Sequence, residues 1–132
     1  MYRPLCLVSA VLVLTAGCSS DRGKFPVSGQ VTFRGQPLDQ GTIEFHKPEV
    51  AGPTATAMIR SGKFSIPGEQ GLAPGTYRVV IRSPEVNPNS GNLMAGGQWP
   101  VNKERIPASY NTESKVTVEV AHKSNTFEFT ID

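Results

Sequence analysis

Apolar and polar residues alternate along most of this chain, and that period of two constrains its fold more than any other feature. In the first such run Val27, Gly29 and Val31 fall on one face, and polar residues fall on the other. Strict alternation is typical of a β-strand with one buried face. The pattern is seen in segments 27–34, 42–46, 54–60, 64–66, 76–82, 115–120 and 126–131. No segment makes a convincing helix, so we predict an all-β fold, a seven-stranded antiparallel β-sandwich.

Turn signals separate the expected strands. Residues 34–39 (RGQPLD) and 61–63 (SGK) combine Gly, which tolerates a positive φ, with residues that favour bends. The second group is a tight hairpin signal. Residues 27–132 have the length of one domain.

Residues 1–17 read as an export signal. Arg3 and the amino terminus supply a short positive region, and residues 5–16 supply an apolar region. The apolar stretch has about 12 residues, whereas a helix that crosses a bilayer needs about 20. We therefore expect a cleaved signal peptide rather than a membrane span.

The residues before Cys18 point to lipid attachment. Residues 14–18 (LTAGC) resemble the lipobox of bacterial lipoproteins, although the bulky Leu stands one position earlier than usual and Thr15 takes its place. An ordinary secretory signal is the alternative. We predict that Cys18 is lipidated and that residues 18–26 form a polar tether, since several acyl chains on one residue anchor a protein stably. The domain would then lie in the cell envelope, anchored to a membrane and exposed to the periplasm or the cell surface.

Cysteine content and charge exclude several classes of function. Cys6 would leave with the signal peptide and Cys18 would carry lipid, so the mature domain would have no disulfide, no catalytic thiol and no cysteine-bound zinc. The formal net charge is +2, and cleavage would remove Arg3 and with it one positive charge. Such a balanced chain lacks the basic stripe of a nucleic-acid-binding protein.

Residues with catalytic or metal-binding chemistry are sparse. The two histidines, His46 and His122, are expected on an outward strand face and in a turn, exposed to solvent. A metal site needs three or four converging ligands, so we predict no metal, no cofactor and no enzymatic activity. Glu44, Glu119 and Glu128 are expected on outward strand positions. A carboxylate pair for glycoside hydrolysis stays open as the weakest alternative.

Segment 84–105 is the place where a binding function is expected. Irregular segments of this length inside a small domain are often functional. This one holds Leu93, Met94 and Trp99, the single Trp of the chain. The three residues either contact a sugar ring or a protein partner, or fold back to cover one end of the domain.

Four other residues are expected to be structural. Tyr77 follows Pro-Gly at the start of a strand, where a Tyr packs inward and ties its hydroxyl to a nearby loop. Ile106, Pro107 and Tyr110 are expected to fasten the long connection to the sandwich.

Four motifs, in order, carry a family resemblance. Residues 27–38 (VSGQVTFRGQPL), 61–66 (SGKFSI) and 72–77 (LAPGTY) resemble the opening strand, hairpin and strand entry of carboxypeptidase regulatory-like, or transthyretin-like, domains. Residues 106–111 (IPASYN) and the final strands are similar to small lipoproteins of the planctomycete type. The resemblance implies a seven-stranded prealbumin-like sandwich and no established activity. The purine-pathway hydrolases of transthyretin type end in a Ser-rich signature, which the ending FEFTID lacks, so their activity is not carried over.

These observations predict a membrane-anchored bacterial lipoprotein. Its β-sandwich would be a non-catalytic interaction or accessory module of the cell envelope, with an envelope protein or a glycan as partner. The alternative is a carbohydrate-binding module that uses segment 84–105.

Overall fold

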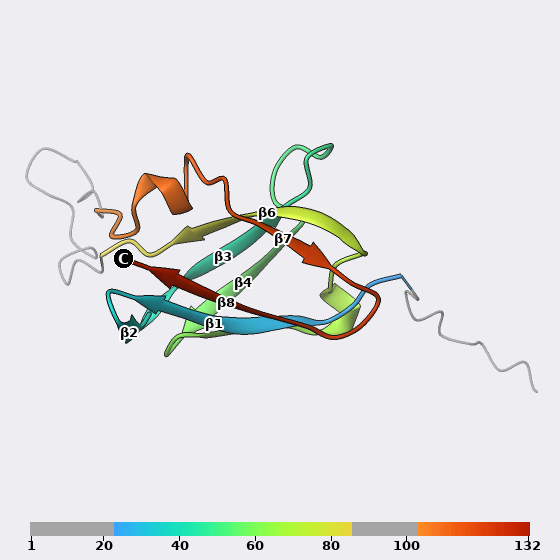
Figure 1. The fold of residues 1–132 in the computed structure, drawn as a ribbon, viewed down its shortest axis with the longest axis horizontal. Helices are drawn as coiled ribbons and strands as arrows, with labels where there is room; N and C mark the ends of the chain where they lie inside the picture. Colours follow the sequence, from blue (N-terminus) through green and yellow to red (C-terminus); the bar gives the residue numbers. More distant parts are fainter. Residues whose placement is uncertain (1–22, 86–102) are drawn as a thin grey trace, which may run out of the picture.

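The computed structural model describes residues 23–85 and 103–132, which form one all-β domain (Figure 1). Its elements are β1 (Val27–Phe33), β2 (Gln36–Pro37), β3 (Gln40–His46), β4 (Ala55–Arg60), β5 (Lys63–Ile66), η1 (Gly68–Gln70), β6 (Gly75–Arg82), η2 (Ala108–Tyr110), β7 (Thr117–Val120) and β8 (Asn125–Ile131). The two η elements are single 3-10 turns, and the described residues contain no α-helix. The prediction of an all-β domain is confirmed.

The strands form one sheet in the order β2-β1-β5-β4-β3-β6-β7, and β8 pairs along the whole length of β1. Among the described strands, β1 and β8 form the one parallel pair, and all other neighbours are antiparallel. Eight strands replace the seven expected. The additional strand, β2, lies where we expected a turn, and it pairs with the end of β1.

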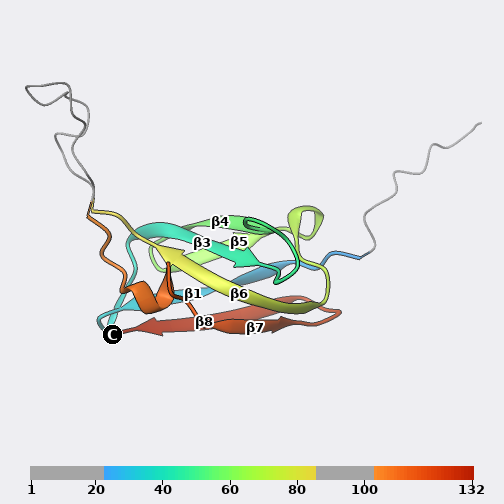
Figure 2. The ribbon, with the colours of Figure 1, turned by 90° about the horizontal axis from the view of Figure 1, so that it is seen from above.

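The sheet curls strongly into a half-barrel. In Figure 2, β1, β7 and β8 lie on one side of the domain and β3 and β4 lie on the other. The link between β4 and β5 is narrow, because Arg60 and Lys63 are the one residue pair that joins these two strands in the described structure. Beyond that pair the two strands of the hairpin separate.

Two-residue turns close the β1–β2 and β4–β5 hairpins. Both central residues have positive φ in each turn, 50° and 78° at Arg34 and Gly35, and 50° and 76° at Ser61 and Gly62. Positive φ at both positions is the mark of the type I′ turn, whose twist matches that of the flanking strands. Gly at the second position adopts this backbone without a Cβ clash, which explains why the Arg-Gly and Ser-Gly signals in the sequence mark hairpins.

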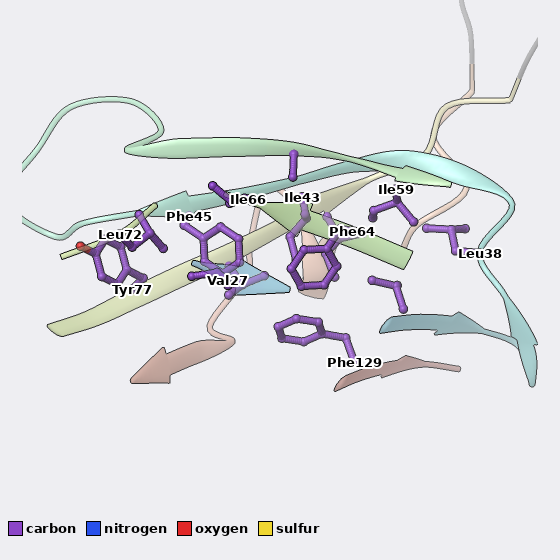
Figure 3. Packing of buried hydrophobic residues seen from close by; sticks show 14 of the residues in the cluster. Val27, Leu38, Ile43, Phe45, Ile59, Phe64, Ile66, Leu72, Tyr77 and Phe129 are labelled. Atoms are coloured by element: carbon purple, nitrogen blue, oxygen red, sulfur yellow. The ribbon is translucent and has the colours of Figure 1, made fainter. Parts of the chain in front are cut away.

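The core fills the inside of the curl (Figure 3). Phe64 lies between Phe45 and Phe129, with ring centroids 6.2 and 6.3 Å away, distances typical of packed aromatic pairs. The buried apolar cluster consists of Val27, Val31, Leu38, Ile43, Phe45, Ala57, Ile59, Phe64, Ile66, Leu72, Tyr77, Val79, Ile81, Ile106, Val120, Phe129 and Ile131. Most of these are the inward residues of the alternating segments, so the period of two predicted the core correctly.

Gly29 is an inward position of β1 that has no room for a side chain. A Cβ there would lie 1.9 Å from the carbonyl oxygen of Phe127 and 2.9 Å from the ring of Phe64. The glycine therefore lets β1 and β8 approach each other while Phe64 covers the gap. A glycine inside a strand often marks such a close backbone approach.

The structure differs from the expected core at three kinds of position. Val116, Val118 and Phe127 were expected to be buried but are half-buried, because β7 and β8 each have a strand neighbour on one side alone. Leu38 was placed in a turn, yet it is 1% exposed in the core. Val80 is 2% exposed although it lies on the outward face of β6.

Three of the four predicted structural residues behave as expected, whereas Pro107 is exposed and contributes its carbonyl oxygen, which accepts a hydrogen bond from Tyr110 N–H at 2.9 Å. Tyr77 is buried, and its hydroxyl donates a hydrogen bond to the carbonyl oxygen of Ala73 at 2.9 Å. Ile106 belongs to the core, and Tyr110 packs against it and donates to the carbonyl oxygen of Thr130 at 3.3 Å.

Candidate functional site

A broad, open hollow of about 570 Å³ lies where β4 and β5 separate. We call it the hairpin hollow. It is lined by Ser28, Gly29, Gln30, Met58, Arg60, Lys63, Phe64, Ser65 and Thr126. These residues come from β1, β4, β5 and β8, so the hollow is built by the β4–β5 hairpin together with two strands from the two ends of the domain sequence.

The polar side chains that line the hairpin hollow have no hydrogen-bond or ion-pair partner among the described residues. Its polar lining residues are Ser28, Gln30, Arg60, Lys63, Ser65 and Thr126, and among the described residues their side chains make no hydrogen bond or ion pair with one another or with other groups. No carboxylate lines the hollow. Met58 is 58% exposed at its edge. The surface can therefore offer donors, acceptors and two positive charges to a ligand without breaking an internal bond.

The type I′ turn places two cationic residues opposite each other in the hairpin. Arg60 and Lys63 are directly paired residues at the closed end of the β4–β5 hairpin. Directly opposed like charges destabilise a strand pair. An anion between the two would relieve that repulsion.

A second group of charged side chains lies on the outward face of β3 and β6. The Nε2 atom of His46 is 2.8 Å from a carboxylate oxygen of Glu44, and Arg82 approaches the other oxygen at 3.9 Å. His46 lies on the outward face as predicted, but its side chain is 16% exposed, so it is less open to solvent than expected. His46, Lys47 and Arg78 also line a small hollow of about 240 Å³.

The other predicted histidine and carboxylates are dispersed. His122 is exposed in the turn before β8, as predicted, and its ring meets that of Phe25 edge to face at 5.6 Å. Glu119 and Glu128 are exposed, and Glu119 accepts a hydrogen bond from Thr76. Among the described residues, no three His, Cys, Asp or Glu side chains come together as a group that could hold a metal ion.

The two ends of segment 84–105 are pinned together. Glu85 N–H donates to the Lys103 carbonyl oxygen at 2.8 Å, and Arg105 N–H donates to the Ser83 carbonyl oxygen at 3.2 Å. The buried hydroxyl of Ser83 donates to the carbonyl oxygen of Gln40 at 2.5 Å. These contacts form a short ladder, which we call the stem.

Arg105 joins the stem to the turn after β2. Its guanidinium donates to Ser83 Oγ at 2.5 Å and to a carboxylate oxygen of Asp39 at 2.7 Å. The hydrogen bond from Arg105 lowers the pKa of the Asp39 carboxyl below its ordinary value. Glu104 completes the stem by accepting from the backbone N–H groups of Ser83 and Ile106 at 2.8 and 2.9 Å.

The residues predicted to act in anchoring and binding lie outside the described part of the chain. Cys18, Leu93, Met94 and Trp99 all fall in segments 1–22 and 86–102. The described residues therefore include the stem of the predicted binding segment but not its apolar residues Leu93, Met94 and Trp99. In the ranges 23–85 and 103–132, no helix is long and apolar enough to cross a membrane.

Sequence reasoning did not find the hairpin hollow. The alternation placed Gln30, Met58 and Arg60 on outward faces, but it could not show that residues of four strands meet at one place. No protein-family model and no curated protein matches this chain. What the hollow and the stem can bind therefore follows from the charge and the hydrogen-bonding groups of their own residues.

Proposed function

We propose that this chain is a lipid-anchored protein of the bacterial cell envelope whose β domain is a non-catalytic binding module. The hairpin hollow is the observation that supports binding most directly, because six polar side chains around it have no partner among the described residues. Lipidation at Cys18 is supported by the lipobox-like residues 14–18.

We further propose that the domain is carboxypeptidase regulatory-like, with transthyretin-like topology. The order of the four sequence motifs supports this assignment. The Arg-Gly and Ser-Gly motifs lie in the tight hairpins and Tyr77 makes its loop contact, as that assignment requires.

Anchoring is tested by fractionating cells that express the full chain or its Cys18→Ala variant. The native chain is expected in the membrane fraction, and the variant in the soluble fraction of the envelope. Retention of the variant in membranes would contradict a lipid anchor at Cys18.

Binding is tested with a photo-crosslinking amino acid placed in the full-length, membrane-anchored protein. At Ser65, in the hairpin hollow, it is expected to give a discrete crosslinked product. At Lys115, which is also exposed but lies outside the hollow, it is expected to give none. The absence of any product from Ser65 would contradict a binding role for the hollow.

A carbohydrate-binding module that uses segment 84–105 is the second candidate. The stem supports it, because Ser83 and Arg105 hold both ends of the segment in fixed positions. Retention of the protein on a neutral polysaccharide column, lost in Trp99→Ala, is the result expected for this candidate. Retention that is unchanged in Trp99→Ala would contradict it.

A further inference from the structure

We propose that the hairpin hollow binds an acidic polysaccharide, with Arg60 and Lys63 contacting its carboxylates. This inference rests on the proposed binding function and names the chemistry of the partner. None of the residues that line the hollow belongs to segment 84–105.

Charge supports an anionic ligand. Arg60 and Lys63 form no ion pair among the described residues, and the lining of the hollow contains no Asp or Glu. The acidic residue nearest along the sheet is Glu128, which pairs with Gln30 but does not line the hollow, and Glu44 on β3 contacts His46 and Arg82. The residues that line the hollow thus carry two positive charges and no negative charge, and guanidinium and ammonium groups bind carboxylates strongly.

The neutral side chains support a polyhydroxylated ligand. Ser28, Gln30, Ser65 and Thr126 project from three strands into one hollow. Hydroxyl and amide groups both donate and accept hydrogen bonds, which suits sugar hydroxyls. Met58 adds an exposed apolar surface for the C–H face of a sugar ring.

The pairing of β1 on both sides favours a polysaccharide over an acidic peptide at that strand. Extended peptides commonly bind by adding a strand to a sheet edge, where unpaired backbone groups are available. Along β1, which contributes Ser28 and Gln30, the pairs with β5 and β8 occupy both sides of the strand. The polar groups that this strand offers to the hollow are therefore side chains. The facing edges of β4 and β5, which are paired at Arg60 and Lys63 alone, are where a peptide strand could add, and the comparison with poly-L-glutamate tests that alternative. A glycan binds through its hydroxyl groups to polar side chains, so it matches this broad open surface better than a peptide does.

The test uses the full-length protein, solubilised in detergent, and measures binding to polygalacturonate, to dextran and to poly-L-glutamate at low salt. We expect binding to polygalacturonate, weakened as salt is added, and no binding to dextran. The double variant Arg60→Gln/Lys63→Gln is expected to weaken the binding by about tenfold or more, since it removes two charge-assisted contacts. The matched variant Lys115→Gln/Lys123→Gln removes the same charge outside the hollow and is expected to leave the affinity unchanged.

A second pair of variants separates sugar recognition from charge. Gln30→Ala/Ser65→Ala keeps both cations and is expected to weaken polygalacturonate binding, whereas Trp99→Ala is expected to keep it. Circular dichroism and Tm show that each variant is folded.

Three results would overturn the proposal. They are no binding of polygalacturonate, an equal loss in the two charge variants, and binding of poly-L-glutamate that is as tight and as dependent on Arg60 and Lys63. The last result would assign the hollow to an acidic protein segment. If Ser65 still gives a discrete crosslink while polygalacturonate does not bind, the binding function stands and the polysaccharide assignment alone is wrong.

Discussion

Replacing Gly29 by Ala tests the contact between β1 and β8. The new Cβ would lie 1.9 Å from the carbonyl oxygen of Phe127, about 1 Å closer than side-chain carbons approach other heavy atoms in proteins. That oxygen belongs to the backbone, so no side-chain rotation relieves the clash. The two strands must move apart along a ladder that extends from Val27 to Phe33.

The cost of Gly29→Ala follows from two effects. Overpacking a buried position costs about 1–3 kcal/mol. Weakening about two ladder hydrogen bonds adds about 1–3 kcal/mol, at about 0.5–1.5 kcal/mol each. The free energy of unfolding should therefore fall by about 2–6 kcal/mol. For a domain of this size, 1 kcal/mol changes Tm by about 4–8 °C, so Tm should fall by about 8 °C or more.

The assay is thermal unfolding followed by circular dichroism, with Gly23→Ala as the control. A Cβ at Gly23 meets no atom within 4 Å, and its φ is not in the left-handed region. The control should therefore melt as the native protein does. If Gly29→Ala melts within about 3 °C of the native protein, a change typical of surface substitutions, the close approach of β1 and β8 is refuted.

Three further predictions concern single side chains. Tyr77→Phe removes one neutral hydrogen bond and should lower the free energy of unfolding in urea by about 0.5–1.5 kcal/mol; an unchanged value would show that the hydroxyl contact contributes nothing. Ser83→Ala leaves buried groups without a partner and should cost about 1–3 kcal/mol, whereas Ser65→Ala, at an exposed hydroxyl, should be neutral; equal effects would contradict the role of the stem. The pKa of Asp39 is lowered by Arg105, so its contribution is present above the pKa of the unfolded chain and is lost as pH falls through the lower folded pKa. The difference in Tm between the native protein and Asp39→Asn should therefore shrink below about pH 4, and a difference that is constant with pH would contradict the pairing.

The repeating pattern of the sequence predicted most of the fold. Alternation identified the inward residues of β3, β4 and β6, because a strand with one buried face leaves no other choice of residue. The Ser-Gly signal predicted the β4–β5 hairpin, because the type I′ turn requires positive φ at both central positions.

The burial of some residues and the position of the hairpin hollow depend on contacts between strands, which the sequence pattern did not predict. Leu38 stands among turn residues, and its burial depends on how β2 returns against β1. Val116 and Phe127 alternate as buried residues do, but the missing neighbours at the sheet edges leave them half-buried. The hairpin hollow depends on the separation of β4 from β5, which is a property of the curl rather than of either strand.

The mass of the intact protein tests whether this chain is the lipid-anchored module that we propose. The protein is extracted from membranes of the expressing cells and measured by mass spectrometry. We predict a chain that begins at Cys18 and carries the mass of a diacylglyceryl group, with or without a further acyl chain. A chain that retains residues 1–17, or one that is cleaved but carries no lipid, would contradict a lipid anchor at Cys18.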